Sequence, residues 1–320
     1  MHKIIKTKVL YREDKMENCL IIINRSAGST DKISFDYVKK ALGNRYKYAC
    51  HTIPSDGEPK LGGYDALAVC GGDGTLSNVL SQVYDKRKDV FYFPYGTLND
   101  KAGASKSLRK NEKTSANAEE HRAIVGVVSR VDCKNRTDEK IPSAQNATVF
   151  SYVYATGTFT PIGYTANVKM KKRFGVLAYL FEVLKEYKVE RIRAQIVADG
   201  NKFKGDFTLV MFIKSPRCFG FKFNKAYDEQ AEAGHLVLIR SPKHNGLLGK
   251  IEIFFPFFRV FFLGLKRERE GNIIFKSFES CTASFDDTIA FCKDGERDEA
   301  SGKIKIDFQK TECHLNLMKK

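Results

Sequence analysis

YDALAVCGGDGTLSNVLSQVY, residues 64–84, is the stretch that decides the fold. Residues 64–70 form an apolar run of strand length that leads directly into the turn Gly71-Gly72-Asp73-Gly74-Thr75. After the turn, apolar residues recur every three or four positions, at Leu76, Val79, Leu80, Val83 and Tyr84. The stretch therefore predicts a strand, a glycine turn and an amphipathic helix.

The same alternation surrounds this stretch in the first part of the chain. Strands are predicted at residues 19–23, 46–52 and 90–93, and a helix is predicted at residues 33–42. Strands that alternate with helices are typical of an open, largely parallel α/β sheet. The first part of the chain is therefore predicted to be an α/β domain.

The second part of the chain has a different pattern. A polar passage at residues 101–147, which contains one apolar stretch at 123–131, is interpreted as the connection between two domains. Short β-rich runs bounded by turn residues follow at 148–155, 193–198, 207–213, 235–239, 273–278, 282–285 and 303–308. Helical segments interrupt these runs at residues 169–187 and 249–267. The pattern predicts a mainly antiparallel second domain.

The net charge indicates what kind of partner the protein binds, and the cysteine pattern indicates the cellular compartment. The 320 residues carry a formal net charge of +16, which favours anionic partners: a nucleoside triphosphate, nucleic acid or an acidic membrane surface. The eight cysteines include no C-x-x-C pair, so neither a zinc site nor a disulfide framework is expected. The N-terminal residues lack the apolar core of a signal peptide. A cytoplasmic protein with reduced thiols is expected.

The glycine turn has the features of a phosphate site. A strand that ends in glycines and opens a helix leaves unpaired backbone N–H groups that point outward, with the positive end of the helix dipole behind them. Glycine lets the backbone approach an anion closely. Asp73 adds a carboxylate there, which suggests chemistry assisted by Mg²⁺. The alternative is an ordinary tight turn in which Asp73 or Thr75 caps the helix.

Two further loops follow predicted strand ends, Asn24-Arg25-Ser26-Ala27-Gly28 and Gly96-Thr97-Leu98-Asn99-Asp100. In open α/β sheets, ligands bind at the carboxyl ends of the strands. All three loops are therefore expected to converge on one edge of the sheet.

Four segments together resemble the diacylglycerol kinase catalytic domain family of soluble lipid kinases, which includes bacterial diacylglycerol kinases and the sphingosine and ceramide kinases. They are residues 21–28, residues 71–75, residues 94–100, and Asp294-Gly295-Glu296 near the C-terminus. The basic segment at residues 172–180 also looks like a helix of the family's second domain.

The resemblance implies a fold of class α/β plus β. It has an N-terminal α/β nucleotide-binding domain at residues 1–147 and 305–320, and a C-terminal β-sandwich substrate domain at residues 148–304. ATP and the lipid substrate would bind in the cleft between the two domains. The family's Asp-Gly beside a second Mg²⁺ site reads Ala233-Gly234 in this sequence, so that metal is not expected.

The resemblance also implies roles for individual residues. Glu296 would accept the proton of the acceptor hydroxyl, with Asp294 and Asp73 as the other catalytic carboxylates. Mg²⁺ would arrive on the phosphates of ATP, with Asp73 or Asp294 as the candidate protein ligand. The residues expected to bind the nucleotide are Asn24, Arg25, Ser26, Ala27, Gly28, Thr52, Gly71, Gly72, Asp73, Gly74, Thr75, Leu76, Ser77, Asn78, Gly96, Thr97, Asn99 and Asp100.

The sequence leaves alternatives open for the identity of the lipid acceptor and for the contact with the membrane. Diacylglycerol is the expected acceptor; a sphingoid base, ceramide, NAD and a non-catalytic module are the alternatives. The Phe-rich segment at residues 251–263, which includes Phe257 and Phe261, would either enter the headgroup region of a membrane or pack as a core helix. Transient peripheral membrane association is expected and nucleic-acid binding is not. The oligomeric state is open and includes a homodimer.

Overall fold

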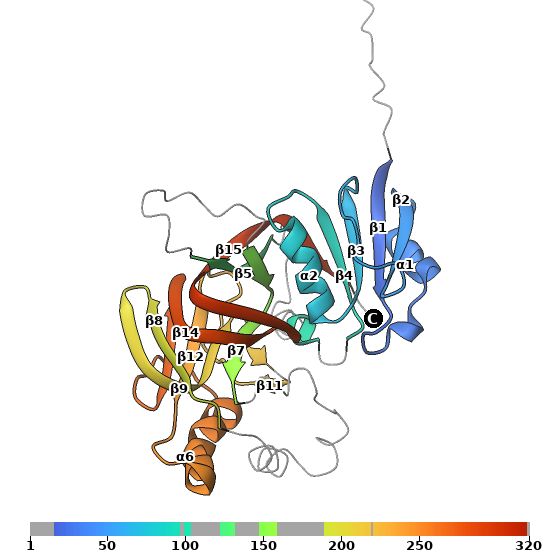
Figure 1. Ribbon diagram of the computed structural model, residues 1–320. Helices are drawn as coiled ribbons and strands as arrows, with labels where there is room; N and C mark the ends of the chain where they lie inside the picture. The colour runs from blue at the N-terminus through green and yellow to red at the C-terminus, as the bar shows by residue number, and fades with distance from the viewer. Residues whose placement is uncertain are drawn as a thin grey trace, which may run out of the picture.

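The structure is a computed structural model that describes residues 16–96, 99–103, 122–131, 147–158, 189–218 and 220–318. An N-terminal parallel sheet with helices lies beside a C-terminal region of long, curved antiparallel strands (Figure 1). The predicted class, α/β followed by a mainly antiparallel β region, is confirmed.

The N-terminal sheet contains the predicted strands in the order β2-β1-β3-β4, all parallel. Their bounds are β1 Glu17–Asn24, β2 Tyr46–Ile53, β3 Ala66–Gly71 and β4 Asp89–Pro94. β3 is buried along its whole length, as expected for a central parallel strand with both faces covered. The glycine turn therefore begins at the end of a fully buried strand.

Helices cover both faces of this sheet. α2 (Asp73–Val83) packs Leu76 and Leu80 against Leu67 and Val69 of β3. On the opposite face, α1 (Phe35–Leu42) buries Val38, and the short 3₁₀ helix η1 (Thr30–Lys32) precedes it. α1 starts two residues later than predicted because the hydroxyl of Ser34 accepts the Tyr37 N–H and sets the N-cap there.

The C-terminal strands are antiparallel and close into a ring. β7 pairs with β9, β9 with β8, β8 with β14, and β14 again with β7. The bounds are β7 Val153–Gly157, β8 Ile192–Ala198, β9 Asn201–Ile213, β12 Gly234–Arg240, β13 Ile273–Phe278, β14 Ser280–Lys293 and β15 Glu296–Leu317. A short hairpin, β10 Arg217–Cys218 and β11 Phe221–Lys222, lies apart from this sheet. A core rich in phenylalanine fills the interior.

β15 joins the two regions. It pairs with β14 from its first residue, and its residues 314–317 pair in parallel with β4 of the N-terminal sheet. The strand runs without a break past residues 304 and 305, where the domain boundary was predicted. One hydrogen-bonded sheet therefore extends through both regions, and the domain limits stay a prediction.

The apolar stretch inside the polar passage is a strand of this shared sheet. β5 (Arg122–Arg130) pairs with residues 304–314 of β15 and with β6 (Ala147–Phe150). It buries Val125 and Val127 among the side chains that pack around α2. The rest of the passage, residues 104–121 and 132–146, lies outside the described residues.

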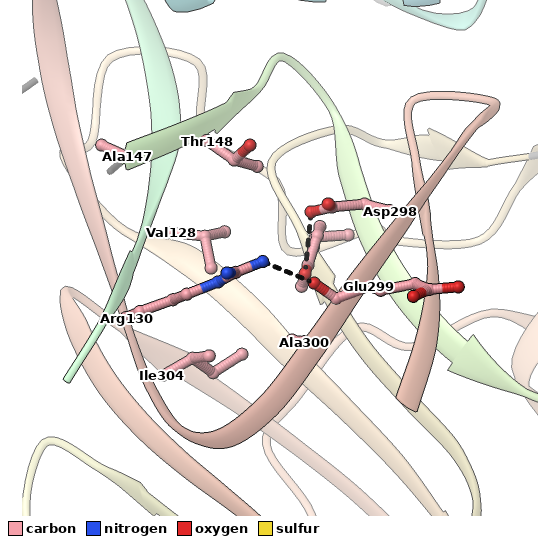
Figure 2. A pocket seen from close by; sticks show the side chains of 9 residues that line it. Val128, Arg130, Ala147, Thr148, Asp298, Glu299, Ala300 and Ile304 are labelled. Carbon is pink, nitrogen blue, oxygen red and sulfur yellow. Dashed lines mark hydrogen bonds between the residues drawn. The ribbon is translucent and has the colours of Figure 1, made fainter. Parts of the chain in front are cut away.

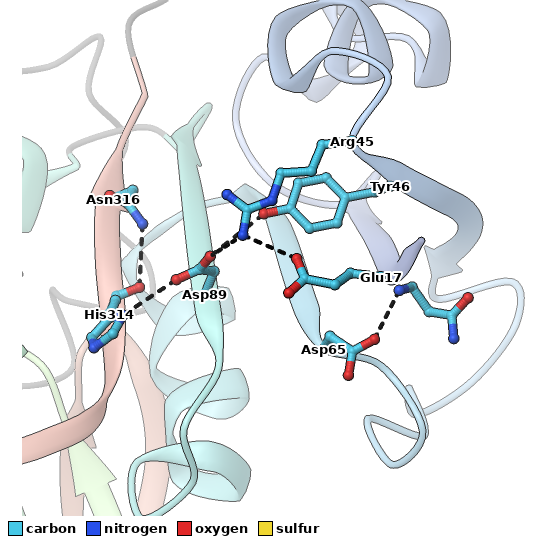
Figure 3. Close-up of polar contacts among 8 residues, drawn as sticks. Glu17, Arg45, Tyr46, Asp65, Asp89, His314 and Asn316 are labelled. Carbon is cyan, nitrogen blue, oxygen red and sulfur yellow. Dashed lines mark hydrogen bonds and ion pairs between the residues drawn. The ribbon is translucent and has the colours of Figure 1, made fainter. Parts of the chain in front are cut away.

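Polar side chains hold β15 at the amino ends of the parallel strands. Asp89 lies 3.3 Å from Nδ1 of His314, 3.4 Å from the hydroxyl of Tyr46 and 4.0 Å from Arg45, which also pairs with Glu17 at 3.0 Å (Figure 3). Glu17, Tyr46 and Asp89 are the first residues of β1, β2 and β4. This cluster is therefore at the opposite end of the sheet from the glycine turn.

The Phe-rich segment forms helix α6 (Gly246–Phe258) and a π-helical turn, η3 (Arg259–Leu263), at the far end of the C-terminal region (Figure 1). One side of the helix buries Ile253 and Phe257 against the sheet. Among the described residues, no helix is both long enough and apolar enough to cross a membrane. The other predicted helix, at residues 169–187, lies outside the described residues.

Candidate active site

The turn between β3 and α2 has a bare backbone. Gly72 is the N-cap of α2, and within the described part of the chain no side chain caps the helix. The N–H groups of the first helical turn have no acceptor inside the helix, so they are available to an anion. This geometry supports the phosphate-site interpretation and not the alternative in which Asp73 or Thr75 caps the helix.

Glycines let the other two loops close onto this turn. A Cβ atom on Gly96 would lie 2.4 Å from Cα of Gly72, and one on Gly28 would lie 2.4 Å from the carbonyl oxygen of Tyr95. Gly28 also has φ +45, which favours glycine. Asn24 adds a side-chain bond, with Nδ2 donating to Oγ1 of Thr75 at 2.9 Å. The three loops converge as expected.

Asp73 lies at the centre of this convergence and is almost fully buried. Its carboxylate accepts from the Tyr92 hydroxyl at 3.1 Å and from the Asp100 N–H at 2.6 Å. Burial, together with the charges of Asp100 and Asp294, raises the pKa of Asp73 to about 7. Asp73 therefore links the loop after β4 to α2 and forms part of a carboxylate cluster.

Asp294 shapes the hairpin turn between β14 and β15. It has φ +50, and its carboxylate accepts from the N–H groups of Ser151, Tyr152 (3.0 Å) and Val153 (2.8 Å). Burial raises the pKa of Asp294, and these backbone bonds oppose that rise. The three bonds hold the hairpin tip in a fixed orientation.

Glu296 reaches α2 from this hairpin. A Cβ atom on Gly74 would lie 2.6 Å from Oε1 of Glu296 and 2.8 Å from its Cγ, so the glutamate side chain lies directly over Gly74. Lys293, on the other side of the turn, donates to Oδ1 of Asn78 at 3.3 Å. The tip of the β14–β15 hairpin lies against the N-terminal end of α2 (Figure 1). Residues 294–296 and 72–74 therefore form one site.

Asp100 completes the cluster and is fully buried. It accepts from the Gly220 N–H at 3.1 Å and lies 3.6 Å from Nε of Arg217. Lys101 is also buried, and its ammonium donates to the Ser151 carbonyl at 3.4 Å. Burial lowers the pKa of Lys101, while Glu229, Asp294 and Asp73 act in the opposite direction.

Tyr92, Lys101 and Arg217 were not predicted from the sequence. Tyr92 lies inside a strand, and Arg217 lies more than a hundred residues after Asp100. Only the position of Lys101, next to the motif residues Asn99 and Asp100, could have pointed to it.

Several residues predicted to bind the nucleotide direct their side chains elsewhere. Leu76 is in the core, and the buried hydroxyl of Ser77 donates to the Val149 carbonyl at 2.7 Å. Arg25 donates to the carbonyls of Thr30 and Ile33, and the Thr52 N–H donates to Asp56. Arg25 and the backbone of Thr52 therefore shape the loops that surround the site, while Leu76 and Ser77 pack inside the N-terminal region.

The remaining predicted residues line the converged loops. Ser26 N–H donates to Oδ1 of Asn24 at 3.0 Å, and the carbonyl of Ala27 accepts from the Thr30 hydroxyl at 2.8 Å. Asn99, with φ +50, donates to the Gly96 carbonyl at 2.6 Å. Thr97 lies outside the described residues.

The described residues fit the phosphates of ATP better than they fit a protein-bound Mg²⁺ ion. In the described ranges, no set of three or more His, Cys, Asp or Glu side chains is arranged to hold a metal ion. Asp73, Asp100 and Asp294 are buried close together, which disfavours their charged forms and raises the pKa of Asp73, so a nearby cation would stabilise the cluster. The uncapped helix start and bare glycine backbones fit the phosphates of a nucleotide.

A cavity of about 240 Å³ lies beside β15, next to the hairpin that carries Glu296 (Figure 2). Arg130 donates to the Glu299 carbonyl at 3.2 Å across it, and Asp298 accepts from the Tyr154 hydroxyl at 3.1 Å. Its lining includes none of the predicted nucleotide-binding or catalytic residues. The cavity is therefore separate from the carboxylate cluster.

Residues 18–131 match the family model described as the diacylglycerol kinase catalytic domain. This match covers β1 to β5 and includes the glycine turn and both neighbouring loops. Three of the four motifs that carried the resemblance, at residues 21–28, 71–75 and 94–100, lie within this match to the diacylglycerol kinase catalytic domain.

Relatives with similar sequences carry the same description. The chain is 28% identical over 187 residues to a diacylglycerol kinase of Staphylococcus saprophyticus, covering 57% of this chain and 56% of that protein. It is 26% identical over 262 residues to diacylglycerol kinases of Staphylococcus aureus, covering 79% of this chain and 74% of theirs.

A crystal structure of a diacylglycerol kinase from Bacillus anthracis superposes with a TM-score of 0.55 at 14% identity, over 94% of this chain and 97% of that one. A second structure from the same organism gives a TM-score of 0.60 at 16% identity, over 93% and 96%. At these identities the comparison shows a shared fold.

Proposed function

We propose that the protein is an ATP-dependent kinase that transfers the γ-phosphate to a lipid hydroxyl, with diacylglycerol as acceptor and phosphatidic acid as product. The observation that carries the proposal is the position of Glu296 over Gly74, at the uncapped start of α2. A carboxylate there faces the place where phosphates would bind. Phosphoryl transfer to an alcohol needs this combination of phosphate site and proton acceptor.

The residues of the site have different roles in the proposed reaction. The N–H groups at the start of α2 bind the phosphates, and ATP with Mg²⁺ supplies the transferable phosphoryl group. Glu296 accepts the proton of the acceptor hydroxyl as the oxygen attacks. Asp294 fixes the orientation of Glu296 through its three backbone bonds. Asp73 and Asp100 hold the loop after β4 in place.

Transfer of radiolabelled phosphate from ATP to a panel of acceptors tests the proposal. The panel contains diacylglycerol, sphingosine, ceramide, undecaprenol and NAD. We expect phosphatidic acid as the product and a loss of roughly 10²-fold or more in Glu296→Gln, the usual contribution of a proton acceptor. Transfer to NAD alone, or equal rates for Glu296→Gln and the wild type, would contradict the proposal.

The variant Gly74→Ala distinguishes an effect on the position of Glu296 from an effect on the stability of the fold. Alanine inside α2 raises helix propensity by about 1 kcal/mol relative to glycine. Its Cβ, however, displaces the Glu296 side chain, so we expect an intact fold with transfer reduced roughly as in Glu296→Gln. Gly62→Ala is the matched control, since no heavy atom of the described chain lies within 4 Å of its added Cβ. Full activity in Gly74→Ala would exclude the role of Glu296.

A lipid substrate also requires a surface that meets the membrane, and helix α6 fits this role. Its outer side exposes Leu247 (72%), Leu248 (61%), Ile251 (51%) and Phe255 (68%). The exposed bases Lys243, Arg259, Lys266 and Arg267 lie near the helix in sequence. The nearby acids are engaged: Glu252 with His244, and Glu268 and Glu270 with Lys276. This surface supports transient association with an anionic membrane on its cytoplasmic side.

A further inference from the structure

A second buried ammonium lies in the C-terminal region and takes no part in the proposed reaction. Lys214 directly follows β9 and is 1% exposed. Its Nζ donates to the carbonyl oxygens of Asp228 (2.7 Å), Ala231 (2.5 Å) and Ala233 (2.9 Å). All three oxygens belong to one loop, which we call the 228–233 loop. An ammonium has three donors, so its hydrogen-bonding capacity is filled.

The arrangement is that of a cation site made of carbonyl oxygens. Three carbonyls of a short loop turn toward one point, where they would repel one another without a positive charge between them. The ring of Tyr227 lies 5.4 Å from Nζ and adds an aromatic face. Burial, together with Lys101, lowers the pKa of Lys214 to about 8, so the group still carries its charge at neutral pH.

The loop is connected to the carboxylate cluster in two ways. The backbone N–H of Lys214 donates to the Tyr152 carbonyl at 2.8 Å, and the segment 151–153 is the one that holds Asp294. From the loop itself, Glu229 is the largest favourable charge acting on Lys101, whose ammonium donates to Ser151. A change in the loop would therefore reach both Asp294 and Lys101.

We propose that the 228–233 loop is a cation site that the chain fills with its own Lys214 ammonium, and that this tethered cation positions Glu229 and residues 151–153 around the carboxylate cluster. Lys214 is a positioning residue, because it acts through the loop and touches none of the reacting groups. The ligand class that would replace it is a small primary ammonium ion.

Limited proteolysis tests the cation site directly. Glu229 and Glu232 make the loop a substrate for a glutamate-specific protease once it opens. We expect cleavage there to be at least roughly tenfold faster in Lys214→Met and Lys214→Ala than in the wild type, because three charge-assisted bonds are lost. Lys202→Met, at an exposed position of β9, should resist cleavage like the wild type.

Rescue of Lys214→Ala by an added ammonium ion distinguishes a cation site from a side chain that only fills space. Ethylammonium at millimolar concentration should slow cleavage of Lys214→Ala toward the wild-type rate, while tetramethylammonium, which has no N–H donors, should not. Equal resistance of Lys214→Met and the wild type, or no rescue of a folded Lys214→Ala, would overturn the proposal.

A measurement on the wild type covers the case in which the variants do not fold. Nitrogen-detected NMR of the lysine ammonium groups should show one with slow proton exchange and scalar coupling to backbone carbonyls, as a buried, fully bonded ammonium requires. If all the lysine ammonium groups exchange freely, the proposal is wrong.

The effect on the active site rests on the proposed function and has its own readout. Lys214→Met should lower kcat of lipid phosphorylation about tenfold while KM for ATP stays unchanged. If neither the wild type nor any Lys214 variant phosphorylates an acceptor, the proposed function is wrong. Proteolysis and NMR then still test the cation site. Normal kcat in a variant whose loop is cleaved would exclude the positioning role.

Discussion

At the scale of single residues, the site depends on carboxylates that are close enough to disturb one another. Asp73 is the clearest case, because its pKa is raised to about 7 by burial and by two neighbouring aspartates. In the unfolded chain its pKa would return to the ordinary value near 3.8. The folded protein therefore binds a proton on Asp73 between about pH 4 and pH 7 that the unfolded chain has lost.

This difference predicts how the stability of Asp73→Asn depends on pH. The ionised carboxylate destabilises the fold, and that effect is complete above the folded pKa and disappears as pH falls toward 4. Asparagine can still accept from the Asp100 N–H and donate to the Tyr92 hydroxyl. We expect Asp73→Asn to be more stable than the wild type at pH 8, with the advantage smaller by on the order of 2 kcal/mol at pH 5.

Urea denaturation in buffer with EDTA measures this difference. Asp287→Asn, at an exposed position, is the control and should show no such trend. An advantage of Asp73→Asn that is the same at both pH values would show that Asp73 is ionised throughout.

The sequence identified the carboxylates at this scale and missed their partners. Asp73, Asp294 and Glu296 stand in short motifs whose spacing is visible in the chain. Tyr92, Lys101 and Arg217 become neighbours of the site only because β4, the loop after it and β10 meet in space. A contact between residues so far apart in sequence leaves no local pattern.

At the scale of elements, α6 shows what a sequence pattern can and cannot decide. The segment is apolar on nearly every side, so its sequence does not indicate which side is buried. The structure combines both interpretations: Phe257 and Phe261 pack in the core, while Leu248 and Phe255 are exposed. Phe257 and Phe261 are therefore the wrong positions for a test of membrane binding.

The structure gives a sharper test of the membrane surface. Leu248→Ser with Phe255→Ser should reduce cosedimentation with vesicles that contain anionic lipid about tenfold, since two apolar side chains no longer enter the headgroup region. Stability should hardly change. Phe257→Ser is the matched comparison and should lose about 3–5 kcal/mol of stability, as buried phenylalanines do. Unchanged cosedimentation of the double variant would exclude α6 as the membrane contact.

At the scale of the whole molecule, β15 makes the two regions one unit. The alternation of strands and helices predicted the N-terminal sheet, and β-rich runs predicted the antiparallel region. The run at residues 303–308 gave no sign of a strand that extends from Glu296 to Leu317 and changes partners on the way. Its length follows from pairing with three other strands, β14, β5 and β4, which is a property of the assembled sheet.

The shared strand predicts that the regions unfold together. Ile306→Ala removes a fully buried side chain from the C-terminal core and should cost about 2–5 kcal/mol. Hydrogen exchange should show the same loss of stability at the amides of β3, although Ile306 belongs to a different core cluster. Ser301→Ala, at an exposed position of β15, should leave both regions unchanged. A loss confined to the antiparallel region would show that the regions unfold separately.

The path of β15 also has a consequence for the order in which the protein can be made. While a ribosome is still translating the first 290 or so residues, β4 lacks its outer neighbour and the start of α2 lacks Glu296. A nascent chain at that stage therefore lacks both the strand that joins the two regions and the carboxylate that lies over Gly74. If the proposed function is correct, phosphoryl transfer begins only after β15 has emerged and paired with β4.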